Sequence, residues 1–172
     1  MSRAIAILLL LVSLTFFSGL GRQAIADSDE AFYAESAREM LEREDWLTPY
    51  FNYQVRFQKP ILFYWMVGST YLVAGISAAA ARFPSALAGL GLALITYLCA
   101  RRRYGNHTGC LAGAIIATSF GYAAMAHQSL PDLPLAFFIT LAIWAGLESL
   151  TSTTPDTRSN QRRWLLLSAS AA

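Results

Sequence analysis

The sequence predicts an all-α integral membrane protein, and three observations support this fold class. Of the 172 residues, 55% are hydrophobic and only 14% are charged, whereas about 25% of the residues in a soluble domain are charged. The mean hydropathy is +0.40. Several apolar runs approach the length of about 20 residues that a helix needs to cross a bilayer. These observations exclude a disordered chain and argue against a soluble enzyme. The formal net charge is only +2, so no nucleic acid partner is expected.

The apolar runs cover residues 4–21, 61–81, 83–100, 107–127 and 133–150. Loops rich in Arg are expected on the cytoplasmic side, and two such loops hold arginines at 101–103 and within 158–163. Both loops lie on that side only if one of the runs before them does not cross the membrane. We expect residues 61–81 to be the run that does not cross, because their tyrosine and tryptophan side chains favour the headgroup region. The alternative is an ordinary span that breaks the charge rule.

The predicted topology has four spans, at residues 4–21, 83–100, 107–127 and 133–150. The N-terminus is then cytoplasmic, and residues 22–82 form an outer loop. A cleaved signal peptide that ends near residue 26 is the alternative for the first span, but the apolar run is longer than the roughly 7–15 residues of a signal core. A further apolar run at 164–172 is too short to cross a bilayer. We therefore interpret residues 1–172 as the N-terminal part of a longer transmembrane domain.

The outer loop is the only long polar stretch, and it contains eight of the eleven acidic residues. Asp27 and Glu30 have the spacing of a capping box, and apolar residues follow them at helical spacing. We therefore expect an amphipathic helix at about residues 29–43. Pro60 suits the first turn of a second helix, which is expected to lie in the membrane interface over about residues 60–78.

This topology places five charged residues at the outer membrane face: Asp29, Glu30, Lys59, Arg82 and Asp132. Each has a purely structural alternative, because acids at a helix start offset the helix dipole and a lysine near the interface can anchor to headgroups. A pair of cations at this face can hold a lipid phosphate, and a carboxylate there can accept a proton. The pattern suits chemistry on a lipid-linked substrate.

Four segments carry a family resemblance. They read D-E-A-F-Y-A-E-S-A-R-E-M-L-E-R-E-D-W-L-T-P-Y at 29–50, R-F-Q-K-P-I-L-F-Y-W at 56–65, A-R-F-P-S-A-L at 81–87 and L-P-D-L-P at 130–134. Their order and spacing resemble the first outer loop and the following helices of integral-membrane glycosyltransferases of the protein mannosyltransferase-like group. The bacterial lipid A aminoarabinose transferases belong to this group.

The resemblance implies a GT-C fold in the bacterial inner membrane, with membrane-parallel helices in the first outer loop. It implies transfer of a sugar from a polyprenyl-phosphate carrier to a lipid, protein or glycan acceptor outside the cytoplasm, and direct attack by the acceptor from the opposite face would invert the anomeric carbon. Asp29 corresponds to the candidate catalytic base, Asp132 to a second site acid, and Lys59 to the residue associated with the carrier phosphate. Glu30 is expected to support the site. Arg82 is expected to be a second phosphate contact, an expectation that rests only on the predicted topology.

Two departures from the aminoarabinose branch bear on the substrate and on cofactors. Gln58 stands where that branch has a glutamate linked to a metal, and Phe32 stands where it tends to have an arginine. Both differences argue against aminoarabinose as the sugar. Because an amide is a poor metal ligand, Gln58 also argues against a divalent metal, and no cofactor is assigned. The alternative function is a non-catalytic membrane subunit that binds lipid or assists assembly.

Overall fold

The computed structural model describes residues 3–151 and 166–170. Its helices and strands, in chain order, are α1 (Arg3–Phe17), α2 (Ser28–Glu42), β1 (Tyr50–Phe51), β2 (Gln54–Val55), α3 (Ile61–Ala74), α4 (Ala78–Tyr104), α5 (Asn106–Thr118), α6 (Phe120–Ala126) and α7 (Asp132–Thr151). The basic segment within 158–163 and both ends of the run at 164–172, at 164–165 and 171–172, lie outside the described residues.

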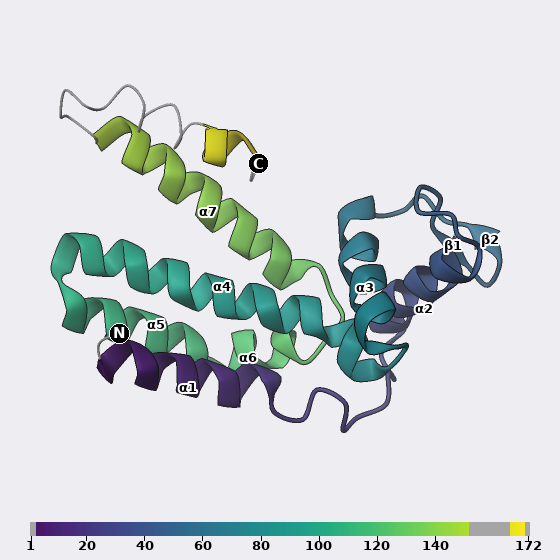
Figure 1. Ribbon diagram of the computed structural model, residues 1–172, viewed down its shortest axis with the longest axis horizontal. Coiled ribbons are helices and arrows are strands. Elements are labelled where there is room, and N and C mark those ends of the chain that lie inside the picture. Colours follow the sequence, from purple (N-terminus) through teal and green to yellow (C-terminus); the bar gives the residue numbers. More distant parts are fainter. Residues whose placement is uncertain (1–2, 152–165, 171–172) are drawn as a thin grey trace.

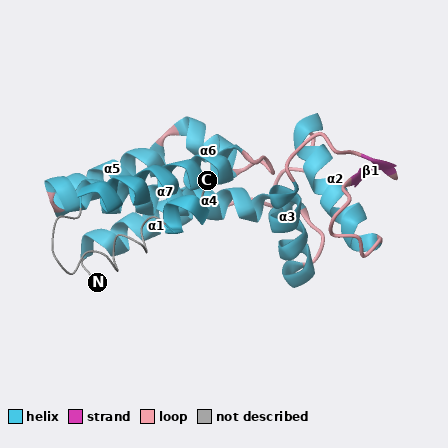
Figure 2. Ribbon diagram, turned by 90° about the horizontal axis from the view of Figure 1, so that it is seen from above, coloured by secondary structure: helices cyan, strands magenta, loops and turns pink. Residues whose placement is uncertain are grey.

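The helices form an elongated bundle with a smaller unit at one end (Figure 1). The bundle contains α1, α4, α5, α6 and α7, whereas α2, α3 and the short antiparallel hairpin β1–β2 make up the end unit. In both views α3 runs crosswise to the long helices of the bundle (Figure 2). Helix α7 begins at the end that carries this unit, so its first turn lies near α2 and α3.

The lengths of the helices differ from the expected spans at α1, at α4, which is 27 residues long, and at the bend between α5 and α6. Within the described residues, α4 and α7 are each long and apolar enough to cross a membrane. The run at 107–127 is not one straight helix, because α5 and α6 meet at a bend of 60° where Ser119 has an extended backbone (φ −68°, ψ 122°). The first helix ends at Phe17, before Gly19 with its positive φ of +78°, so it is shorter than the expected run.

Helix α4 is the centre of the bundle, and small residues let α5 approach it closely. Gly109, Gly113 and Ala117 recur at every fourth position of α5, and all three are buried. A Cβ atom on Gly109 would lie only 2.8 Å from the Tyr97 carbonyl oxygen of α4. Such spacing of small residues is typical of closely packed membrane helices.

A hydrophobic cluster separate from the bundle joins α2 to α3. Tyr33, Ala37 and Met40 form the buried face of α2 and pack against aromatic and aliphatic side chains of α3, at the helical spacing that the sequence shows. The N-cap of α2 is Asp27, whose carboxylate accepts a hydrogen bond from the Asp29 amide at 2.8 Å. The expected capping box does not form, because the Glu30 side chain points into the protein instead.

Candidate functional site

A polar cavity of about 330 Å³ lies where α2, α3 and the start of α7 meet. Its lining residues are Asp29, Phe32, Tyr33, Arg56, Lys59, Tyr64, Leu130, Pro131 and Asp132. Three of the five site residues predicted from the sequence, Asp29, Lys59 and Asp132, therefore line one cavity. Asp29 and Asp132 are 103 positions apart in the chain, so only the fold brings them together.

The ends of three helices position these side chains. Asp29 is in the first turn of α2, Asp132 is in the first turn of α7, and Lys59 directly precedes Pro60, the N-cap of α3. All three side chains are exposed to the cavity or to solvent. None of them has a hydrogen-bond or ion-pair partner among the residues that the structure describes, so each is available to a ligand.

Two tyrosines form the buried wall of the cavity. The rings of Tyr33 and Tyr64 lie 5.6 Å apart, and burial raises the pKa of both hydroxyls. The negative charges of Asp132 and Asp29 raise the pKa of Tyr33 further, whereas the charge of Arg56 lowers it. Both hydroxyls are therefore protonated at neutral pH and can donate hydrogen bonds to a bound ligand.

Arg56 is a cavity residue to which the sequence assigned no role. Its guanidinium carbon lies 3.7 Å from the centre of the Phe32 ring and 5.3 Å from that of Phe51. The residue directly follows β2, and its backbone amide donates to the Pro49 carbonyl at 2.8 Å. Its position thus depends on the hairpin, and no helical or strand periodicity in the sequence marks it.

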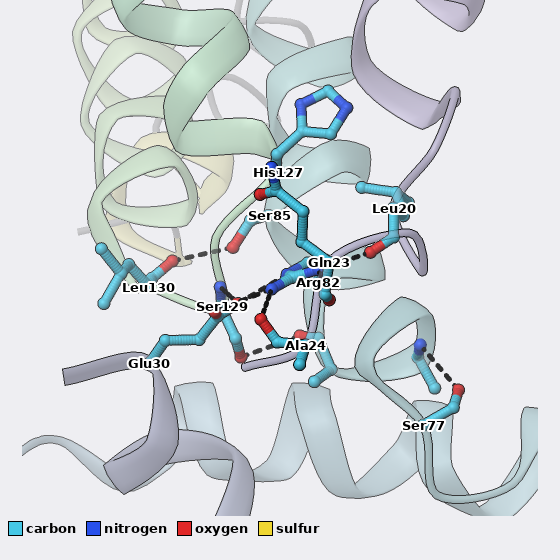
Figure 3. Close-up of polar contacts among 12 residues, drawn as sticks. Leu20, Gln23, Ala24, Glu30, Ser77, Arg82, Ser85, His127, Ser129 and Leu130 are labelled. Atoms are coloured by element: carbon cyan, nitrogen blue, oxygen red, sulfur yellow. Dashed lines mark hydrogen bonds and ion pairs between the residues drawn. The ribbon is translucent and has the colours of Figure 1, made fainter. Parts of the chain in front are cut away.

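Glu30 and Arg82, predicted as a supporting site acid and a second phosphate contact, have a different place in the structure. They form a buried ion pair, with side-chain exposures of 3% and 5% (Figure 3). Arg82 Nε donates to Glu30 Oε1 at 2.7 Å, and Nη2 donates to Glu30 Oε2 at 2.9 Å. The remaining donors bond to the carbonyl oxygens of Leu20, Gln23 and Ala24.

The environment of Arg82 corrects its predicted role. A guanidinium has five N–H donors, and all five have acceptors within the protein. Neither Arg82 nor Glu30 lines the polar cavity. Arg82 therefore has no donor left for a phosphate. The predicted topology could not show whether Arg82 is paired inside the protein or available to a ligand.

The ion pair instead belongs to a network of hydrogen bonds that connects the elements around the cavity. Glu30 Oε1 also accepts a hydrogen bond from the Ser129 amide at 2.8 Å, and Ser129 Oγ donates to the Ala81 carbonyl at 2.9 Å. Ser85 Oγ of α4 donates to the Leu130 carbonyl at 2.8 Å, as Figure 3 shows. These bonds connect the first turn of α2 and the start of α4 to the loop before Asp132. They fix the two cavity carboxylates relative to one another.

The described residues offer few ligands for a divalent metal in the polar cavity. Asp29 and Asp132 are the carboxylates that line the cavity, and Gln58 is exposed and does not line it. Within residues 3–151 and 166–170, no group of three or more His, Cys, Asp or Glu side chains is placed to hold a metal ion.

An apolar cavity of about 230 Å³ adjoins the polar one. The two cavities share Tyr33, Lys59 and Pro131. The remaining lining residues of the apolar cavity are Pro60, Leu62, Phe63, Met66, Pro134, Leu135 and Phe138. Lys59 thus lies at the junction of a polar and an apolar space, which is the arrangement that an amphiphilic ligand requires.

Comparison with known proteins gives consistent matches over nearly the whole chain. Residues 4–171 match the family model described as dolichyl-phosphate-mannose-protein mannosyltransferase. An undecaprenyl phosphate-alpha-4-amino-4-deoxy-L-arabinose arabinosyl transferase 2 from Proteus mirabilis is 33% identical over 153 residues, which cover 88% of this chain and 28% of the relative. An uncharacterized protein from Aquifex aeolicus is 36% identical over 88% of this chain and 30% of its own length.

The solved structures confirm the fold class. The crystal structure of ArnT from Cupriavidus metallidurans bound to undecaprenyl phosphate matches with a TM-score of 0.87 and 26% identity, over 97% of this chain and 30% of ArnT. The chain is thus an all-α membrane protein of the GT-C type. It spans between 28 and 30% of the length of the two curated relatives above. The chain belongs to the dolichyl-phosphate-mannose-protein mannosyltransferase family.

Proposed function

We propose that the chain forms the donor-binding and catalytic part of a membrane glycosyltransferase, which moves a sugar from a polyprenyl-phosphate carrier to an extracytoplasmic hydroxyl. The observation that carries this proposal is the position of Lys59 between the two cavities. A phosphate next to Lys59 leaves the sugar in the polar cavity with Asp29 and Asp132, and the prenyl chain in the apolar cavity. A structurally similar enzyme has been solved with undecaprenyl phosphate bound.

The arrangement supports an inverting displacement. The acceptor oxygen forms a bond to the anomeric carbon while the bond from that carbon to the phosphate oxygen breaks, and polyprenyl phosphate leaves. Asp29 accepts the proton of the acceptor hydroxyl, as a general base within hydrogen-bond reach. Lys59 balances the negative charge that grows on the leaving phosphate. Asp132 supports the site as the second acid, with its carboxylate available to the hydroxyl groups of the sugar.

The same fold supports an orientation with the cavity on the outer face. The loop before Asp132 is bonded to the first turns of α4, whereas Arg101, Arg102 and Arg103 occupy the last turn of α4. Since α4 has 27 residues, it is about 40 Å long at 1.5 Å per residue, which is enough to separate the cavity and the arginines by a bilayer. The positive-inside rule then favours a cavity on the outer side, and the crosswise direction of α3 suits a helix in the interface (Figure 2).

The test replaces Asp29 by asparagine in the natural full-length protein and measures transfer from a labelled polyprenyl-phosphate sugar. The variant keeps the shape of the side chain but removes the base, so transfer is expected to fall by roughly 10²- to 10⁴-fold. Membrane insertion and binding of undecaprenyl phosphate are expected to survive. Asp27→Asn is the matched control, because Asp27 caps the same helix outside the cavity and asparagine is an equally good cap.

Three outcomes separate the alternatives. Loss of transfer in Asp29→Asn with normal transfer in Asp27→Asn supports the assignment of the base. Unchanged transfer in Asp29→Asn refutes Asp29 as the base. Binding of undecaprenyl phosphate by the wild-type protein without transfer to any extracytoplasmic acceptor supports a non-catalytic lipid-binding subunit instead.

A further inference from the structure

Arg56 is an arginine of the polar cavity that is held by aromatic rings. Its guanidinium carbon lies over the Phe32 ring at 3.7 Å and near Phe51 at 5.3 Å. Aromatic contact of this kind uses the face of the planar guanidinium. The N–H groups, which lie in the plane at its edge, are left to bind an acceptor. The two rings therefore hold the charge in place without consuming its donors.

The charge of Arg56 has no counter-ion within the described residues. Arg38, Arg82 and Arg102 each pair with a glutamate at 2.6 to 2.9 Å, whereas the side chain of Arg56 makes no such pair with any residue that the structure describes. Its Nε atom is buried and has no hydrogen-bond partner among residues 3–151 and 166–170. A buried donor that loses its hydrogen bond to water is costly unless another acceptor replaces that bond. The local structure is thus incomplete without an acceptor.

Arg56 lines the same polar cavity as Lys59. The cavity therefore contains two cations that have no ion-pair partner in the described part of the chain, one a planar donor group and the other an ammonium. Planar guanidinium groups bind phosphate oxygens with two parallel hydrogen bonds, and ammonium groups bind them as point charges. A single phosphate between them satisfies both cations and leaves the two carboxylates of the cavity free for the sugar and the acceptor.

We propose that Arg56 is a second phosphate-binding residue of this cavity and contacts the carrier phosphate together with Lys59. This inference rests on the proposed function, because the phosphate is that of the polyprenyl donor. It gives Arg56 the role that the topology had assigned to Arg82. Phe32 and Phe51 then act as positioning residues, which hold the guanidinium of Arg56 at the cavity wall.

The test measures binding of undecaprenyl phosphate to the full-length protein in lipid nanodiscs, with undecaprenol as the ligand that lacks the phosphate. Arg56→Gln is expected to weaken binding of undecaprenyl phosphate roughly 10- to 100-fold, the loss that one charged hydrogen bond predicts. Binding of undecaprenol is expected to be unchanged. The matched control is Arg43→Gln, because Arg43 lies over the Tyr50 ring at 4.3 Å but does not line the cavity.

A second measurement uses the wild-type protein and does not depend on how a variant folds. Phenylglyoxal modifies accessible guanidinium groups, and the modified peptides are quantified by mass spectrometry. Undecaprenyl phosphate is expected to protect Arg56 and not Arg43, and undecaprenol is expected to protect neither. Equal modification of Arg56 with and without undecaprenyl phosphate would overturn the proposal.

The outcomes also distinguish this proposal from the proposed function. If Lys59→Met loses binding of undecaprenyl phosphate and Arg56→Gln keeps it, Arg56 is not a phosphate contact and the proposed function stands. If Arg56→Gln weakens binding of both ligands equally, the effect is structural and the proposal is wrong. If the wild-type protein does not bind undecaprenyl phosphate, both proposals fail together.

Discussion

Replacement of Arg82 by methionine is expected to destabilise the protein by about 3–5 kcal/mol, the usual cost of removing one partner of a buried ion pair. The reason lies in what the substitution leaves behind. Glu30 would be left without its cationic partner at a site where its side chain is only 3% exposed. Three backbone carbonyl groups would also lose their donors. Methionine has a similar length and fills much of the same space, so the loss of charge and of hydrogen bonds dominates.

A matched variant isolates the effect of burial. Arg38 also pairs with two carboxylate groups, those of Glu35 and Glu42, at 2.7 and 2.9 Å. Its side chain is 30% exposed and its partners are 36% and 49% exposed. Exposed pairs contribute about 0.2–1 kcal/mol, so Arg38→Met is expected to change stability little. The assay is thermal unfolding of the detergent-purified full-length protein, followed by tryptophan fluorescence.

We expect a much larger fall in the unfolding midpoint for Arg82→Met than for Arg38→Met. We also expect the double variant Glu30→Gln/Arg82→Met to unfold at a higher temperature than Arg82→Met, because the uncompensated charge is gone. Equal midpoints for the two single variants would refute the assignment of a buried, structural ion pair. A double variant less stable than Arg82→Met would do the same.

Three further predictions concern packing, pH and the phosphate site. Gly109→Ala is expected to destabilise the contact of α5 with α4 by about 1–3 kcal/mol, because its Cβ would lie 2.8 Å from the Tyr97 carbonyl oxygen. The control is Gly121→Ala, whose Cβ would meet nothing within 4 Å. This control should be neutral or stabilising in the same unfolding assay. Burial raises the pKa of Tyr71 to about 12, above the value near 10 of an unfolded tyrosine. The stability of the folded protein should therefore fall as pH rises from about 10 to 12. Tyr71→Phe should make that fall shallower when unfolding midpoints are measured against pH. Lys59→Met should weaken binding of undecaprenyl phosphate but not of undecaprenol in a nanodisc binding assay, and equal affinities of the variant and the wild type for undecaprenyl phosphate would contradict its role.

The sequence was sufficient where a pattern is local. The apolar face of α2 follows from the spacing of Tyr33, Ala37 and Met40, and the start of α3 after Pro60 follows from the proline itself. The family, and with it the GT-C fold, followed from motifs in the outer loop. The same motifs named Asp29, Lys59 and Asp132, the residues that the fold then brings to one cavity. Their chemical roles remain predictions.

The sequence was insufficient where a role depends on distant partners. Asp29 and Glu30 are neighbours in the chain, but consecutive residues of a helix point in directions about 100° apart. One therefore faces the cavity, and the other meets Arg82, which is 52 positions away. Arg56 depends on a hairpin and two rings, and the bend at Ser119 has no proline to signal it. These features come from tertiary contacts, which produce no regular spacing of residues in the sequence.

The most direct test of the central claim is cysteine labelling with a membrane-impermeant maleimide, in a full-length variant whose native cysteines are alanine. We expect Lys59→Cys and Asp132→Cys both to be labelled from outside the cell, and Arg103→Cys to be labelled only after the membrane is opened. In Asp132→Cys, which keeps Lys59, undecaprenyl phosphate is expected to slow labelling and undecaprenol is not. Labelling of positions 59 and 132 from opposite sides, or labelling of Asp132→Cys at a rate that undecaprenyl phosphate leaves unchanged, would contradict a shared outer site.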